Sequence, residues 1–207
     1  MPYSAEAKDL MLNALKGTNP TTPITHVGLL TAGAEITSVS SSDALTFDKT
    51  SHGLVAGDIV ILTEKTGGSA LVAGDAVNAN EAARIYFVIA TGLTANAFRV
   101  STIPGGSAEA HGSNVTSVKV IKLTELSGGS YARVSIAYNT AVGGTMDDST
   151  NGAVINVPAA GVVNYVSYHS ASTSGKVLAI DKVTQESFGA AGTYTLTDSK
   201  LDLNEGS

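Results

Sequence analysis

The chain has 207 residues, a formal net charge of −6, and neither cysteine nor tryptophan. The absence of cysteine excludes disulfides and thiolate metal sites. Its 12 Lys and Arg residues are scattered singly, which argues against nucleic-acid binding because phosphate affinity requires clustered cations. No apolar run approaches the ~18 residues of a membrane helix, and the first residues do not follow the signal-peptide pattern, so we expect a soluble protein.

Small residues, threonine and valine dominate the composition, and hydrophobic residues make up 43% of the chain. That fraction is large enough for packed cores, so global disorder is not expected. The abundance of the β-branched residues threonine and valine favours a mainly β protein. Length alone leaves open one large β-domain or two small ones.

Residues 4–16 carry the one convincing helical pattern. Ser4 is placed to cap the first turn and Gly17 to end the last, and apolar residues between them recur at spacings of three and four. A helix this short is marginal alone in water and needs a packing partner. The partner is either one end of its own β-domain or a neighbouring subunit.

The first predicted strand runs from Ile24 to Ala32 and is expected to end at Gly33. The pattern of apolar segments and turn residues then changes. Between residues 35 and 122, short apolar segments alternate with turn residues, which predicts a small all-β module. Its six expected strands are residues 36–39, 44–47, 59–62, 84–89, 97–101 and 115–123.

The first pattern resumes in residues 123–138. Gly128 and Gly129 predict a hairpin turn, and the alternation after it predicts a strand over residues 131–138. We expect Arg133 in this strand to be an ordinary surface or interface charge. One face of the strand is expected to carry Ala132, Val134, Ile136 and Tyr138.

Further strands are expected at residues 153–157, 162–169, 176–180 and 193–197. The predicted fold class is therefore mainly β, with an antiparallel β-sandwich outer domain, an inserted small all-β module and one short N-terminal helix. Residues 1–34 and 123–207 form the outer domain, and residues 35–122 form the inserted module, because insertions are tolerated at exposed loop tips. The alternative is one continuous sandwich of about twelve strands, which approaches the size limit of a single core.

The sequence shows no pattern typical of catalysis or metal binding. The four histidines, His26, His52, His111 and His169, have no ligand spacing such as H-E-x-x-H, so we expect structural or surface roles. No G-x-S-x-G nucleophile elbow is present. Two oxygen-rich loops lack EF-hand calcium spacing. These loops contain Asp147, Asp148 and Asn151, and Asp75, Asn78, Asn80 and Glu81. We therefore expect no catalytic, cofactor or metal site, and no enzyme.

Several segments together resemble small β-sandwich structural proteins of tailed bacteriophage virions, which are often labelled tail-fibre-like or decoration proteins. In the outer domain these are Ile24–Ala32, Glu125–Arg133, the Asn156–Pro158 step, Phe188–Leu196 and Leu201–Asn204. Separately, the inserted module resembles a module found in phage structural proteins. Its matching segments are Ser51–Asp58, Tyr86–Val88 and Asn96–Val100.

The resemblance implies a structural virion protein, assembled in the host cytoplasm, whose partners are other virion proteins such as the major capsid or tail proteins. A capsid decoration (cement) protein is favoured over a minor tail or tail-fibre protein, because the chain is short and lacks a repetitive shaft. A homo-oligomer such as a trimer is expected, with no nucleic acid and no membrane. A carbohydrate-binding β-sandwich or depolymerase is the alternative from a different class.

Overall fold

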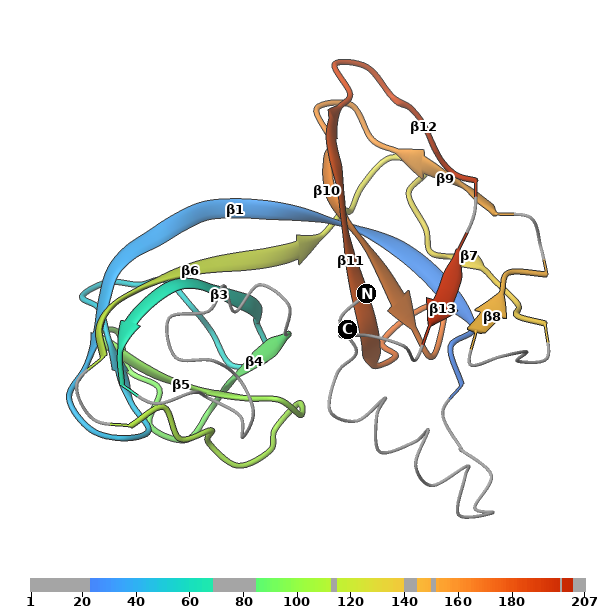
Figure 1. The fold of residues 1–207 in the computed structure, drawn as a ribbon. Coiled ribbons are helices and arrows are strands. Elements are labelled where there is room, and N and C mark those ends of the chain that lie inside the picture. Colours follow the sequence, from blue (N-terminus) through green and yellow to red (C-terminus); the bar gives the residue numbers. More distant parts are fainter. Residues whose placement is uncertain are drawn as a thin grey trace, which may run out of the picture. The chain divides into compact units, whose positions relative to one another are not determined.

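The structure is a computed structural model that describes residues 23–68, 85–112, 115–139, 145–149, 152–197 and 199–202. Within these ranges the chain forms strands and no helix (Figure 1). Every strand pair whose register is defined is antiparallel. The prediction of a mainly β protein is thus confirmed. The helix expected over residues 4–16 lies outside the described residues, and none of the described residues belongs to a helix that could cross a membrane.

The described residues divide into two compact units. We call the unit with the chain up to Thr31 and from Glu125 onward the outer unit, and Ala32–Thr124 the insert unit. β1 (His26–Ser41) begins in the outer unit and ends in the insert unit. That residues 35–122 fold as an independent inserted module stays a prediction.

The outer unit contains one sheet and two strand pairs. In the sheet, β10 (Val162–His169) lies between β1 and β11 (Val177–Ser187). β7 (Val134–Ser135) pairs with β1 as well. The separate pairs are β9 (Ala153–Val157) with β12 (Gly192–Leu196), and β8 (Thr145–Asp147) with β13 (Lys200–Asp202).

The core of the outer unit joins the sheet to the β9–β12 pair. Along β9, Ala153, Ile155 and Val157 are buried, whereas Val154 between them is 59% exposed. This alternation follows from the two-residue period of a strand with one buried face. The buried face of β9 packs into one cluster with side chains of β1, β10 and β11, including Leu29, Val166 and Leu178.

In the insert unit, six of the described strands close into a ring. The order is β1, β2 (Phe47–Asp48), β5 (Ala97–Ser101), β4 (Tyr86–Ile89), β3 (Ile59–Gly67) and β6 (Val115–Glu125), and β6 pairs with β1 again. A closed ring removes the unpaired strand edges that an open sheet would present.

A stack of four rings runs through the core of the insert unit. His111 stacks on Phe47 with centroids 4.0 Å apart, and Phe47 stacks on Phe98 at 5.3 Å. His52 meets the other side of Phe98 edge-on at 5.1 Å. Offset and edge-on arrangements of this kind are the favoured geometries of aromatic pairs. Both histidines are therefore part of the packing of this core.

Three expectations about strand limits are wrong. The first strand does not end at Gly33, because β1 continues through it to Ser41. The segment expected over residues 44–47 is mostly a bend, since Asp43 Oδ1 accepts hydrogen bonds from the backbone N–H groups of Leu45 and Thr46 and holds the chain in a turn.

The third concerns residues 131–138, of which only β7 is a strand. Gly128 and Gly129 do form a turn, with φ angles of 91° and 56°, but it is not a hairpin. β6 before the turn pairs with β3, whereas β7 after it pairs with β1.

Candidate functional site

The four histidines lie in two places. His26 and His169 are register partners on β1 and β10 of the outer unit, and His52 and His111 lie in the core of the insert unit. His52 Nε2 donates to the carbonyl oxygen of Thr94 at 2.9 Å, while its Nδ1 accepts from the N–H of Leu54 at 3.0 Å. No group of three or more His, Asp and Glu residues within the described ranges is arranged to hold a metal ion.

The acidic loops singled out in the sequence are only partly described. Asp148 is buried, and its Oδ2 accepts a hydrogen bond from the backbone N–H of Gly152 at 2.6 Å. This bond joins the residue that follows β8 to the residue that precedes β9. Asp147 is described as well and is exposed. The remaining candidate oxygen ligands lie outside the described residues, namely Asn151, Asp75, Asn78, Asn80 and Glu81.

A partly buried ion pair lies where the chain returns to the outer unit. Arg133 contacts Glu125 through two bonds, Nε to Oε1 at 2.7 Å and Nη2 to Oε2 at 2.6 Å. Its Nη1 also donates to the carbonyl oxygen of Ala171 at 3.0 Å. The Arg133 side chain is only 10% exposed. The expectation of an ordinary surface charge is therefore wrong, and the alternative of an interface charge stays a prediction.

Tyr131 joins this ion pair to β1. Its hydroxyl accepts a hydrogen bond from the N–H of Leu29 at 2.9 Å and donates to Glu125 Oε1 at 3.0 Å. A Cβ at Gly28 would lie 2.9 Å from that hydroxyl and 3.2 Å from Glu125 Oε1. Glycine is therefore required at position 28, because any side chain would displace the polar groups of the cluster.

His169 completes the cluster with a buried ring. Its Nε2 bonds Ser167 Oγ at 2.8 Å, and its Nδ1 is buried with no hydrogen-bond partner among the described residues. Burial lowers the pKa of His169 to about 4, and the positive charge of Arg133 acts in the same direction. The nearby Glu125 carboxylate opposes this shift without reversing it. The ring is therefore neutral near pH 7.

The electrostatics of the cluster suit a structural role better than catalysis. Burial is the largest single effect and disfavours the charged form of Glu125. The hydrogen bonds from Arg133 and Tyr131 and the neighbouring positive charge together outweigh it and lower the pKa of this carboxyl. Burial raises the pKa of the Tyr131 hydroxyl. A carboxylate with both oxygens engaged is a poor base, and a phenol with a raised pKa is a poor acid. The cluster instead fixes the chain from Glu125 to Arg133 against β1.

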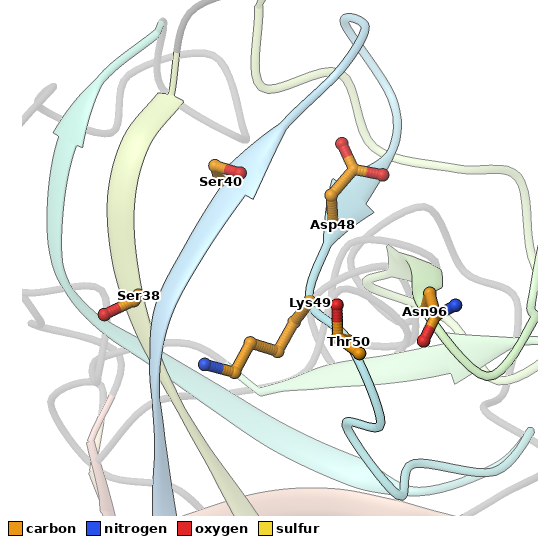
Figure 2. A pocket seen from close by; sticks show the side chains of 6 residues that line it. All are labelled: Ser38, Ser40, Asp48, Lys49, Thr50 and Asn96. Atoms are coloured by element: carbon orange, nitrogen blue, oxygen red, sulfur yellow. The ribbon is translucent and has the colours of Figure 1, made fainter.

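An open pocket of about 490 Å³ lies in the insert unit (Figure 2). Its lining comes from the end of β1, from β2 and the two residues after it, and from the turn before β5. Every lining side chain is polar. The lining residues are Ser38, Ser40, Asp48, Lys49, Thr50 and Asn96.

None of these pocket residues was selected from the sequence. They are common surface residue types, and their sequence positions span almost sixty residues. One sequence pattern does point to this surface. Ser38 and Ser40 are two residues apart and flank the buried Val39, and this spacing places both hydroxyls on the outer face of a strand. Only the pairing of Ser40 with Asp48 shows that the second strand adds to the same face.

Comparison with known proteins gave no match. No protein-family model matches the chain, and no curated protein or solved structure matches it either. The resemblance to phage structural proteins therefore stays a prediction, and the functional argument depends on the chain's own residues.

Replacing Arg133 should destabilise the outer unit. In Arg133→Met the Glu125 carboxylate loses its partner, and we expect a loss of about 2–3 kcal/mol in the free energy of unfolding, somewhat below the value for a fully buried pair. The double variant Arg133→Met, Glu125→Gln should recover part of this loss. Urea unfolding measures both. Lys119→Met, which breaks the exposed Lys119–Glu64 pair, is the control and should leave the midpoint unchanged; equal effects of the two single variants would contradict a special role for Arg133.

Acid should destabilise the chain through His169. The pKa of this ring is about 4 in the folded protein, against the ordinary histidine value of 6.5, so the unfolded chain binds the proton more tightly. The contribution of His169 to the free energy of unfolding is therefore fully present above pH 6.5. It falls by up to about 3 kcal/mol as the pH drops toward 4. Unfolding free energies measured from pH 7 to 4.5 for the wild type and His169→Gln should converge as the pH falls. Parallel curves would exclude this assignment.

Proposed function

We propose that the chain is a structural virion protein of a tailed bacteriophage, most specifically a capsid decoration (cement) protein on the particle surface. In this proposal the outer unit is an antiparallel β-sandwich and residues 35–122 are an inserted module. Residues 4–16 form a short helix. The chain is not an enzyme and needs no cofactor, and its partners are copies of itself, as in a trimer, and the major capsid protein.

The observation that supports the proposal most is where the resembling segments lie. In the outer unit, Ile24–Ala32 contains the first half of β1 and Phe188–Leu196 contains β12. Glu125–Arg133 is tied to β1 by the Tyr131 bridge to Leu29. The segments that carry the resemblance are therefore the framework of one unit, as expected if they define a shared fold.

The segments that resemble the phage module also meet, in the insert unit. Gly57 N–H donates to the carbonyl oxygen of Val88, and Val88 N–H donates to the carbonyl oxygen of Asp58. His52 packs edge-on against Phe98. These contacts join Ser51–Asp58, Tyr86–Val88 and Asn96–Val100 in one core. Two resemblances in two separate units favour a virion protein assembled from modules.

The physical demands on a cement protein agree with this architecture. Such a protein gains affinity from many copies that bind a regular lattice, so each contact can be weak. A β-rich chain with few charges supplies rigid, closed units for that purpose. The same resemblance supports assembly in the host cytoplasm, without binding to nucleic acid or membrane.

The open pocket of the insert unit favours a second candidate, a minor tail or tail-fibre protein that contacts the host. A concave surface lined by unengaged polar groups suits recognition of a ligand outside the particle. A decoration protein needs no such pocket. A carbohydrate-binding protein without a virion role is the remaining alternative.

The copy number per particle tests the proposal. Virions are purified from the lysate of a strain that carries the gene, and the protein is quantified by gel densitometry. We expect hundreds of copies of the chain per particle, because decoration proteins follow the capsid lattice. The major capsid band of the same gel is the internal standard. A handful of copies would indicate a tail protein, and absence from the particle would exclude a structural role.

Deletion of residues 1–17 tests the proposed helix as a docking arm. We expect the truncated chain to keep a β-rich circular dichroism spectrum and a cooperative melt, because every described strand remains. It should no longer co-sediment with particles stripped of the native protein, whereas the full chain does. Loss of the cooperative melt would instead assign the helix to the chain's own core.

A further inference from the structure

The pocket of the insert unit is the strongest unassigned feature of the molecule. Two adjacent strands build its floor, because Ser40 on β1 and Asp48 on β2 are register partners. In Figure 2 the Lys49 side chain extends from the chain after β2 toward β1, Thr50 lies beside it, and Asn96 lies on the other side of Thr50. Donors and acceptors from three segments thus surround one open space.

Five of the six lining side chains, all except that of Asn96, are not used to hold the protein together. Within the described residues, no ion pair or side-chain hydrogen bond is formed by the Asp48 carboxylate, the Lys49 ammonium or the hydroxyls of the lining serines and threonine. Charged groups elsewhere in the unit differ. The Asp58 carboxylate accepts from the N–H of Val55 and pairs with Lys122.

The backbone beneath the pocket is held in place. The carbonyl oxygen of Asn96 accepts from the N–H of Lys49 at 2.9 Å, and its Oδ1 accepts from the N–H of Ser51 at 3.0 Å. The amide N–H₂ of Asn96 stays available to a ligand. Ser38 has a φ of 57°, which is uncommon for a residue other than glycine and marks a local irregularity of β1 beside the pocket. The backbone that carries the polar groups after β2 is therefore fixed.

The chemistry of the lining selects one class of ligand. A lipid or apolar ligand is disfavoured because no lining side chain is apolar. A phosphate is disfavoured because Asp48 accompanies the single cation, Lys49. A ligand with many hydroxyl groups can both donate to the carboxylate and accept from the ammonium and amide. A sugar ring has this character, and about 490 Å³ accommodates one or two rings.

We propose that the pocket formed by Ser38, Ser40, Asp48, Lys49, Thr50 and Asn96 binds a saccharide. The affinity of one pocket lies in the millimolar range, because a lining without apolar surface gains little from the hydrophobic effect. Several copies held together bind a glycan-bearing surface more tightly. This proposal is independent of the virion assignment and holds for any assembly of the chain.

The test is a titration of the full chain, labelled with ¹⁵N, followed through its amide resonances. The probes are N-acetylglucosamine, galactose, glucose and rhamnose, with inorganic phosphate at matched ionic strength. We expect at least one sugar to shift the amides of residues 38–51 and 94–97 and to saturate. Asp48→Ala should weaken this binding by about tenfold or more, while Glu64→Ala, a carboxylate of the same unit outside the pocket, should not.

The proposal is overturned if no sugar shifts these amides, if phosphate alone does, or if the shifts fall elsewhere. It is also overturned if Asp48→Ala binds as the wild type does. Unchanged resonances away from the pocket show that a variant is folded. Lys49→Ala replaces Asp48→Ala if the latter does not fold, with Lys119→Ala as its matched control.

Discussion

A partly buried ion pair at the return of the chain is the constraint on which the outer unit depends. Removing the Glu125 carboxylate from water costs energy that only a close, well-oriented cation offsets, and the two-bonded guanidinium of Arg133 supplies it. The pair spans eight positions and closes the turn between them. Tyr131 connects it to β1, and Gly28 leaves the space that the cluster occupies.

The same constraint explains why the chain after this turn is not a regular strand. Leu126 N–H donates to the carbonyl oxygen of Leu29, and Ile136 N–H donates to that of Thr25. The chain therefore meets β1 before the turn and again after it, and the residues between them are committed to the ion pair. Their alternating polarity reflects two kinds of burial, with Ile136 in the apolar core and Arg133 in the polar cluster.

The insert unit is organised by a different principle, the closure of its strands around an aromatic stack. His52 and His111 pack against phenylalanines in the core, so their rings do not form a reactive site at the surface. A group of polar side chains, most of them without a partner among the described residues, lies where two paired strands and a turn face solvent. A closed ring thus separates the residues that stabilise the unit from those that can meet a ligand.

The sequence by itself determined the mainly β class and most strand positions, because the two-residue period of polarity is local and survives in any context. It also placed the Gly128–Gly129 turn. Only the tertiary structure decided that β1 runs through Gly33, that Arg133 is buried, and that Ser40 and Asp48 share a pocket. These outcomes depend on partners far away in the chain, and local pattern carries no information about which distant group a side chain meets.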